Sequence, residues 1–316
     1  MLPLDLAAES QARRYVLIVA ALAGGVLVLL GLLNYWVDPN GYFGRNTLGY
    51  FSVTTDHQFK LLALKRHPHD AVLLGNSKAA MANLTPIRQP YPFFNGGVGG
   101  AMIEDVLSVL QRVPATSPLV VVELDYLEFN NAFAMGARFP QIESSPKLLD
   151  NLLSLQMTSS SIKTLAGAFS NSTLGYQENG TYVPDKWYDR YDHGDATEHT
   201  QILAEHLTLL SGYKIMPERV ALLETLRAAL EARHQPFLVY LHPMNTEEMA
   251  QIRKVGLGLA FEAWRERVHQ VFPEVTDLTN STYSDPKNYF RQDPVHPYPT
   301  VGCELIEKEV LPKFHE

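Results

Sequence analysis

Three side chains from opposite ends of the sequence could together perform nucleophilic acyl chemistry. Ser77 follows a short apolar segment that ends at Gly75, and Asp293 precedes His296 by three residues near the C-terminus. A serine hydroxyl becomes a nucleophile when a histidine takes its proton, and a carboxylate often orients that histidine. Ser77, His296 and Asp293 are therefore a candidate nucleophile, base and orienting group. Taken alone, Ser77 would be interpreted as the N-cap of a helix.

Short apolar segments at regular intervals predict the elements that would bring these residues together. The segments cover residues 71–75, 92–98, 119–129, 236–243 and 275–279. Their length and their content of Val, Leu and Phe are typical of buried parallel strands. Alternation of such strands with helices predicts an α/β fold, in which helices cover both faces of a parallel sheet. Ligands bind beyond the carboxyl ends of strands in such sheets, so we expect Ser77 and the loop that carries Asp293 and His296 to meet there.

Apolar residues at helical spacing lie between the predicted strands. The predicted helices cover residues 55–66, 77–83, 101–113, 146–168, 198–211, 217–234, 246–270 and 300–310. The last helix should stop before Pro312, because the residue that precedes a proline disfavours the helical conformation. A hairpin is predicted for 176–184, where Asn179-Gly180 supplies a turn that tolerates positive φ.

The N-terminal segment is apolar over a length that matches a lipid bilayer. Residues 15–37 carry no charge, and a helix of that length spans about 34 Å, enough for a hydrocarbon core of about 30 Å. Arg13 and Arg14 precede the segment, and Tyr35 and Trp36 end it, as is typical of membrane anchors. A cleaved signal peptide and a buried helix are the alternatives, but the segment is long for a signal peptide and its exit lacks a cleavage site with small residues.

The anchor divides the chain into three parts. We expect residues 1–14 to be a cytoplasmic tail, 15–37 to cross the inner (cytoplasmic) membrane once, and 38–316 to form one periplasmic or other extracytoplasmic domain. Within that domain, an irregular insertion is expected at about 130–200.

Composition excludes several classes of protein and site. Hydrophobic residues make up 46% of the chain and charged residues 19%, which excludes wholesale disorder. A net charge of −8 argues against a general nucleic-acid binder. A lone Cys303 permits no intramolecular disulfide and is expected to pack in the last helix. GGVGG at 96–100 does not match a dinucleotide fingerprint, and we expect neither a cofactor nor a bound metal.

Three blocks of the sequence together resemble the SGNH, or GDSL-like, hydrolase superfamily, in its membrane-anchored extracytoplasmic branch. LLGNSKAAM is similar to the block in which serine follows the first strand. FFNGGVGGA resembles the second block, and DPVHPYPTVGCELI the final D-x-x-H block. The resemblance covers roughly residues 70–130 and 285–312. It implies a three-layer, flavodoxin-like parallel sheet.

The resemblance also implies roles for individual residues. Ser77 would be the nucleophile, His296 the general base and Asp293 its orienting partner. Backbone N–H groups of Ser77 and Gly100 would form the oxyanion hole, since Gly100 is the best match to the glycine of the second block.

The sequence departs from the family pattern in two places. The first block reads GNS rather than GDS, and the usual G-x-N-D of the third block is replaced by VVVELDYLEFNN. Asp125 corresponds to that region, but an ionised aspartate would repel an oxyanion. Asn130 and Asn131 could supply the missing amide or be polar loop residues. Asn76 follows a predicted strand, His242 ends another, and Asp125 lies in the altered third block; all three are candidates for contacts with substrate.

The anchored branch that the chain resembles includes alginate O-acetyltransferases and the teichoic-acid D-alanylation protein. The resemblance implies a serine O-acyltransferase or esterase that acts on acyl groups of exopolysaccharides or other envelope polymers. A transferase would work beside a membrane-embedded acyl exporter. Two alternatives stay open: a catalytically inactive scaffold or binding subunit of a polysaccharide assembly, and a phosphate-linked hydrolase aided by Lys78.

Aromatic residues of the insertion could stack on sugar rings or anchor the insertion to the core. They are Tyr176, Tyr182, Trp187, Tyr188 and Tyr191.

Overall fold

Five runs of aliphatic residues form a parallel sheet, as the sequence predicts. The strands are β2 (Ala71–Leu74), β3 (Phe93–Asn95), β4 (Val120–Leu124), β7 (Phe237–Leu241) and β8 (Thr276–Asp277). Their spatial order is β3-β2-β4-β7-β8, and every neighbouring pair is parallel. The order reverses between β2 and β4, and open sheets bind ligands at the carboxyl ends of the strands that flank such a point.

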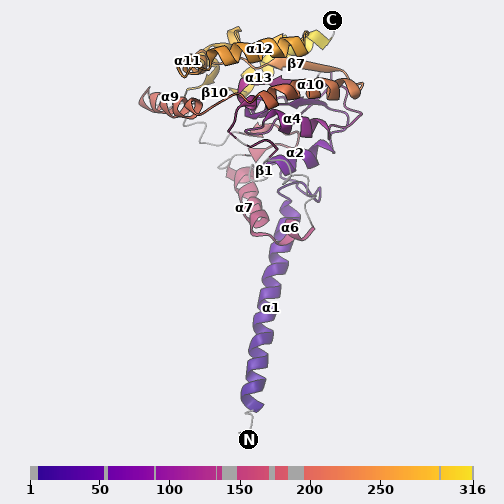
Figure 1. Ribbon diagram of the computed structural model, residues 1–316. Coiled ribbons are helices and arrows are strands. Elements are labelled where there is room, and N and C mark those ends of the chain that lie inside the picture. Colours follow the sequence, from indigo (N-terminus) through magenta and orange to yellow (C-terminus); the bar gives the residue numbers. More distant parts are fainter. Residues whose placement is uncertain are drawn as a thin grey trace.

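Side chains of each strand alternate between two apolar cores. Val72 and Leu74 face one core, with α4 (Ile103–Leu110), α10 (Pro217–Ala232) and α12 (Gly258–Val271). Ala71 and Leu73 face the other, with α3 (Ser77–Met81) and α13 (Pro299–Leu305), where Cys303 is buried. The fold is therefore α/β, with helices on both faces of the sheet (Figure 1).

The computed structural model describes residues 6–52, 56–88, 90–132, 134–136, 148–170, 175–183, 196–291 and 293–314. The remaining helices are α1 (Leu6–Val37), α2 (Asp56–Leu64), α6 (Leu148–Leu153), α7 (Leu155–Ser170), α9 (Ala196–Ser211) and α11 (Thr246–Lys254). The remaining strands are β1 (Phe51–Ser52), β5 (Gly175–Tyr176), β6 (Tyr182–Val183), β9 (Tyr289–Phe290) and β10 (Asp293–Pro297). Trp187, Tyr188 and Tyr191 lie outside the described residues.

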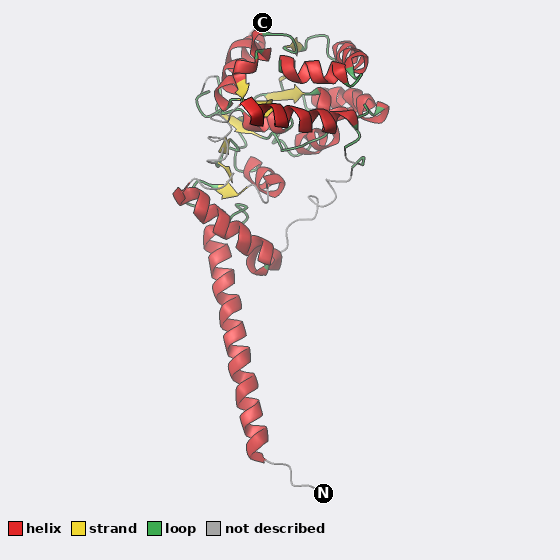
Figure 2. Ribbon diagram, turned by 90° about the vertical axis from the view of Figure 1, so that its left-hand side faces the viewer, coloured by secondary structure: helices red, strands yellow, loops and turns green. Residues whose placement is uncertain are grey.

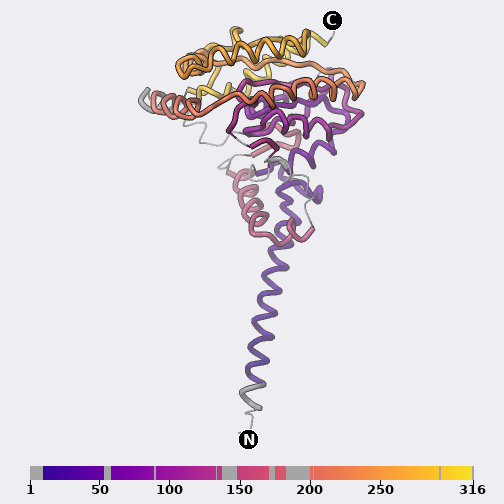
Figure 3. Tube along the Cα trace, viewed as in Figure 1, coloured from indigo at the N-terminus to yellow at the C-terminus, as the bar shows by residue number. Residues whose placement is uncertain are grey.

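A smaller unit lies between the parallel sheet and α1. It contains α6, α7 and an antiparallel sheet of order β1-β5-β6, so the predicted irregular insertion holds regular elements. Asn34 of α1 donates to Leu152 O at 2.8 Å and accepts from Ser161 Oγ at 2.8 Å. Segments that are more than one hundred residues apart therefore lie side by side, as the chain traces show (Figures 2 and 3).

The long helix α1 extends away from both units. Its Ser10–Val37 segment has a mean hydropathy of 2.9 over the most apolar window, and none of that window is buried. By length and composition, this helix could cross a membrane. The two ends of the molecule lie far apart, with the C-terminus on the side opposite to α1 (Figure 1).

The structure divides the predicted helix 146–168 into α6 and α7 at Ser154, and it corrects four further local predictions. The predicted helix 246–270 is two helices, because the chain breaks at Gly256, whose φ is +82°. The predicted strand 119–129 ends at Leu124 and continues as a 3₁₀ turn. Asp293 and His296 lie on β10 rather than on a loop.

The fourth correction concerns the C-terminal helix. It does not stop before Pro312 but continues through a π-helical turn (Ile306–Val310) into a 3₁₀ turn (Leu311–Phe314). Proline is tolerated there because it is the second residue of the new turn, where a missing N–H removes no turn hydrogen bond.

The approach of β3 to α3 gives a first prediction. A Cβ on Gly97 would lie 2.5 Å from Ala80 N and 2.9 Å from the carbonyl carbon of Ala79. Gly97→Ala must therefore push α3 away, and we expect it to lower the free energy of unfolding by about 1–3 kcal/mol. Denaturant unfolding of the full chain in detergent measures this loss.

Gly212→Ala is the matched control. The nearest atom to a Cβ there is Leu209 O at 3.7 Å, so this variant should unfold like the wild type. Equal stability of the two variants would contradict the predicted clash.

Candidate active site

Ser77 is the first residue of α3, directly after the turn that follows β2. Asn76 is the N-cap, and its Oδ1 accepts from Lys78 N at 2.7 Å. Gly75 has φ +155°, and a Cβ there would lie 2.8 Å from Glu123 Cβ, so only glycine fits the turn. Ser77 is thus held on a sharp strand-to-helix turn, and the N-cap role that it could have had belongs to Asn76.

Buried polar side chains hold α3 at both ends. A helix of five residues cannot sustain itself, because nucleation costs more than so few hydrogen bonds return. Glu123 Oε2 accepts from Ala79 N at 2.9 Å, which places a carboxylate at the N-terminal end of the helix. Asn95 Nδ2 donates to Ala79 O and Ala82 O, both at 2.9 Å, at the other end. These contacts fix the direction in which Ser77 points.

The structure brings Ser77, His296 and Asp293 into one hydrogen-bonded chain. Ser77 Oγ lies 2.8 Å from His296 Nε2, and His296 Nδ1 lies 2.7 Å from Asp293 Oδ2. Asp293 Oδ1 also accepts from His296 N at 3.3 Å, which fixes the carboxylate. The side chains of Asp293 and His296 are about one-fifth exposed, so the base borders solvent.

The hairpin of β9 and β10 places His296 beside Ser77. The two strands are antiparallel, with a register shift between Asp293 and Pro297. Asn245 Nδ2, from the segment after β7, donates to Pro294 O at 3.0 Å. Tyr289 Oη donates to Pro243 O at 2.8 Å. The hairpin is therefore tied to the carboxyl end of the central sheet.

Electrostatics keep the Asp293 carboxyl ionised and make His296 a stronger base than a free imidazole. Burial raises the pKa of Asp293, but the charge and hydrogen bond of His296 outweigh burial and lower it, so this carboxyl stays ionised. Burial lowers the pKa of His296, but the Asp293 charge and hydrogen bond outweigh it and raise the pKa above its ordinary 6.5. Nδ1–H then donates to Asp293, which leaves Nε2 to accept the Ser77 proton.

A buried ion cluster lies beneath the serine, and sequence analysis did not predict it. Lys78 Nζ lies 2.9 Å from Asp125 Oδ2 and 3.3 Å from Glu248 Oε2, and all three side chains are at most 1% exposed. Burial lowers the pKa of Lys78, but the two carboxylates outweigh burial and raise it, so the amine is charged. A lysine within the apolar run SKAAM was the one signal of this cluster in the sequence.

The cluster compensates the negative charge of Asp125, which was expected to repel an oxyanion. Burial raises the pKa of Asp125, but Lys78, then His242, outweigh it and lower the pKa, so Asp125 is ionised. Its charge is compensated by Lys78, and its Oδ2 also accepts from Asn76 Nδ2 at 3.1 Å. Asp125 therefore supports the turn before Ser77, and at 1% exposure it is not open to a substrate.

The other predicted binding residues are also engaged within the protein. His242 is 3% exposed, and its Nδ1 lies 3.2 Å from Glu123 Oε1. Asn130 Nδ2 donates to Leu127 O and its Oδ1 accepts from Ala132 N, while Asn131 Oδ1 accepts from Lys214 N. These hydrogen bonds hold Asn130 and Asn131 within the protein, and Asn130 is 1% exposed, whereas the contact of the buried His242 is the ion contact with Glu123.

Ser77 supplies a candidate backbone donor for an oxyanion. Ser77 N has no acceptor among the described residues, and it lies at a helix N-terminus, where the dipole favours negative charge. The loop that contains Gly100 is joined to the serine turn, because Val98 N donates to Gly75 O at 3.0 Å. Gly100 has φ +63°, in the left-handed region that favours glycine.

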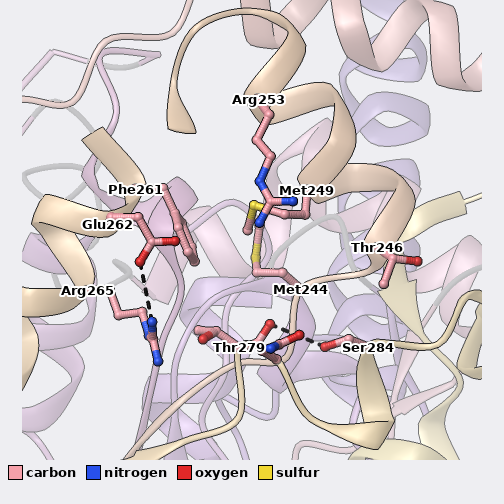
Figure 4. A pocket seen from close by; sticks show the side chains of 10 residues that line it. Met244, Thr246, Met249, Arg253, Phe261, Glu262, Arg265, Thr279 and Ser284 are labelled. Atoms are coloured by element: carbon pink, nitrogen blue, oxygen red, sulfur yellow. Dashed lines mark hydrogen bonds and ion pairs between the residues drawn. The ribbon is translucent and has the colours of Figure 1, made fainter. Parts of the chain in front are cut away.

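Two hollows lie near the site. One, of about 370 Å³, follows the β9–β10 hairpin and includes Phe290, Tyr298, Lys287 and Arg291 in its lining. The other, of about 190 Å³, lies between α11 and α12. Arg253 of α11 extends toward Met249 and Met244 there (Figure 4).

Within the described residues, no group of three or more His, Cys, Asp or Glu side chains could hold a metal ion. No protein-family model matches the chain, and no curated protein matches its sequence.

The ion cluster gives a second prediction. Lys78→Met would leave Asp125 and Glu248 buried without their cation, and we expect it to destabilise the protein by about 3–5 kcal/mol. Lys308→Met is the matched control, because Lys308 pairs with Glu304 on the surface and such pairs contribute about 0–1 kcal/mol. Denaturant unfolding of both variants measures the difference. A Lys78→Met protein as stable as the control would contradict the cluster.

Proposed function

We propose that this chain is a membrane-anchored serine O-acyltransferase or esterase of the SGNH-like kind, acting on acyl groups of cell-envelope or exported polysaccharides. The observation that carries the proposal is the hydrogen-bonded chain from Ser77 through His296 to Asp293. Its position beyond the carboxyl end of β2, at the point where the strand order reverses, adds support. The sequence blocks that resemble that superfamily supply all three residues.

The proposed chemistry has two steps. Ser77 Oγ attacks the acyl carbonyl while His296 Nε2 takes its proton, and the oxyanion accepts hydrogen bonds from the N–H groups of Ser77 and Gly100. The tetrahedral intermediate collapses, the bond to the leaving group breaks, and His296 returns the proton to that group. A sugar hydroxyl, or water, then loses its proton to His296 and attacks the acyl-serine. The bond between the acyl carbon and Ser77 Oγ breaks, and His296 returns the proton to Oγ. One oxyanion donor typically lowers the barrier by about 3–4 kcal/mol.

The hollow beside the β9–β10 hairpin supports a sugar as the acyl acceptor. Tyr298, which is half-buried, lines it together with two cationic side chains, and its ring packs against the buried Phe290 at a centroid distance of 4.7 Å. Aromatic faces stack on sugar rings, and cations attract acidic polymers. Tyr176 and Tyr182, by contrast, are buried and pack in the core.

The structure argues against the alternative of a phosphate-linked hydrolase aided by Lys78. Lys78 is 1% exposed and paired with two carboxylates, so it is not available to a phosphate group at Ser77.

The proposal also includes the topology: α1 crosses the inner membrane once, and residues 38–316 lie on the extracytoplasmic side. A transferase of this topology would receive its acyl group from a membrane-embedded exporter.

A fluorophosphonate probe tests the proposed nucleophile. Ser77 Oγ should attack phosphorus and displace fluoride, which adds one phosphonyl group to the full chain in detergent. Intact mass should show one adduct in the wild type and in Ser211→Ala, where a surface serine is removed, and none in Ser77→Ala. His296→Ala should react much more slowly than the wild type. A folded wild-type protein without adduct would overturn the proposal and favour the scaffold alternative.

The pH dependence of this reaction tests the proposed base. His296 accepts a proton only when neutral, so the phosphonylation rate should rise with pH and level off above a midpoint higher than 6.5. Asp293→Asn removes the charge that raises the pKa of His296, so the midpoint should move to lower pH. The plateau rate should fall by about 10⁴-fold.

A second histidine–aspartate pair provides the control. His67 Nδ1 lies 2.8 Å from Asp70 Oδ2 with the same spacing in sequence, and Asp70→Asn should leave the rate profile unchanged. A profile that Asp293→Asn does not shift would exclude His296 as the base.

A further inference from the structure

Helix α7 packs a face that is polar except for Met157, and it exposes an apolar stripe beside the polar Gln156, Ser159 and Lys163. The face that packs against the rest of the protein contains Ser160, Ser161, Thr164 and Gly167, all buried. The outward face carries Leu155, Ile162 and Phe169, which are 83%, 57% and 79% exposed. Each of these residues follows the previous one by seven positions, or about two helical turns, so they form one stripe along the helix. A helix in contact with water would place the two sets of residues the other way round.

Helix α6 extends this apolar surface. Leu148, Leu149 and Leu153 are also exposed. We call these three leucines and the α7 stripe the α6–α7 apolar surface. Contiguous apolar patches on soluble proteins are uncommon, and they mark contacts with a partner or a membrane.

Contacts with Gly31 and Asn34 hold the α6–α7 apolar surface beside the last turns of α1. A Cβ on Gly31 would lie 3.5 Å from Leu153 Cδ2, and Asn34 bonds with Leu152 O and with Ser161. A span that begins at Tyr15 and needs about 20 residues to cross the hydrocarbon core ends near Asn34. Leu153 is therefore level with the last turns of that span. Figures 1 and 2 both show α6 and α7 beside α1, on the side of the soluble part from which that helix extends.

We propose that the α6–α7 apolar surface is embedded in the outer leaflet of the membrane that α1 crosses, with lipid acyl chains as its occupant. This inference rests on the proposed membrane anchoring by α1, but not on the proposed chemistry. The surface lies beside the end of α1, a helix whose most apolar window is exposed all round and which carries Leu27, Leu29 and Leu32 there. Interfacial helices bury such an apolar face about 5–10 Å into the boundary between headgroups and acyl chains.

The surface adds a second attachment to the single helix. One helix anchors a domain but leaves it free to tilt and rotate. Contacts at α6 and α7, to one side of α1, would fix the orientation of the domain above the bilayer. The domain would then present the same edge of its sheet to the membrane throughout its working cycle.

Depth-dependent fluorescence quenching tests this proposal on the full chain. Cys303→Ala removes the native thiol, and single cysteines replace Leu155 or Phe169 for labelling with an environment-sensitive fluorophore. The protein is reconstituted into phosphatidylcholine–phosphatidylglycerol vesicles that contain lipids brominated on the acyl chains. We expect blue-shifted emission and quenching at both positions.

Two further positions calibrate the result. Leu259→Cys on α12 replaces another leucine, 88% exposed but distant from α1, and should not be quenched. Val26→Cys in α1 should be quenched if that helix spans the membrane. Quenching at Val26 without quenching at Leu155 would overturn lipid as the occupant and leave the anchor intact. Absence of quenching at Val26 would overturn the anchor and this proposal together, while the reaction of Ser77 with the probe would be unaffected.

Discussion

The position of Ser77, the proposed nucleophile, depends on one buried ion cluster. Lys78 is the neighbour of Ser77 on α3, and its ammonium lies between Asp125, after β4, and Glu248 on α11. A charge removed from water must be paired, because an unpaired buried charge costs several kcal/mol. The requirement to keep this lysine paired therefore holds α3, β4 and α11 at fixed separations. Apolar side chains of the same size could fill the space, but they would specify the direction of Ser77 less well.

Helix α11 connects the nucleophile to its base. Glu248 in its first turn pairs with Lys78, one residue after Ser77. Asn245, its N-cap, accepts from Glu247 N and donates to Pro294 O, one residue after Asp293. Both halves of the hydrogen-bonded chain thus contact the same turn of one helix. A distance of 2.8 Å between Ser77 Oγ and His296 Nε2 is maintained by this shared support, although 219 positions separate the two residues in the sequence.

The sequence predicts what local pattern and strand order determine. Aliphatic runs located the five strands, and their carboxyl ends predicted that Ser77 and His296 would meet. Single residues with long-range partners could not be assigned in this way. Asp125 was expected to repel an oxyanion, since no pattern shows that Lys78, 47 positions earlier, would be turned inward to pair with it. The helix break at Gly256 was missed because apolar spacing continues across it, although a glycine that follows the C-cap Val255 with φ +82° is a common helix end.

A continuous series of contacts connects α1 to α3, which carries the proposed nucleophile. It runs through α6, α7 and the sheet β1-β5-β6, which the proposed anchoring makes the membrane-proximal unit. Asn34 of α1 bonds with Ser161 of α7, and Thr164 of the same helix accepts from Ser52 N in β1. The sheet β1-β5-β6 leads to the turn at 179–180. Its Asn179 O accepts from Asn95 N at 2.8 Å, and the Asn95 side chain binds the carbonyls at the end of α3.

These contacts give the membrane-proximal unit a role in the proposed chemistry. Lys60 reinforces the last of them, because its fully buried ammonium donates to both Asn95 O and Gly180 O. Each step is a backbone or buried polar bond, so movement of the unit relative to α3 would leave buried groups unpaired. An enzyme that takes its acyl group at a membrane needs its nucleophile at a constant height above the bilayer. This rigid connection from α1 to α3 would provide that constant height, which a flexible linker could not.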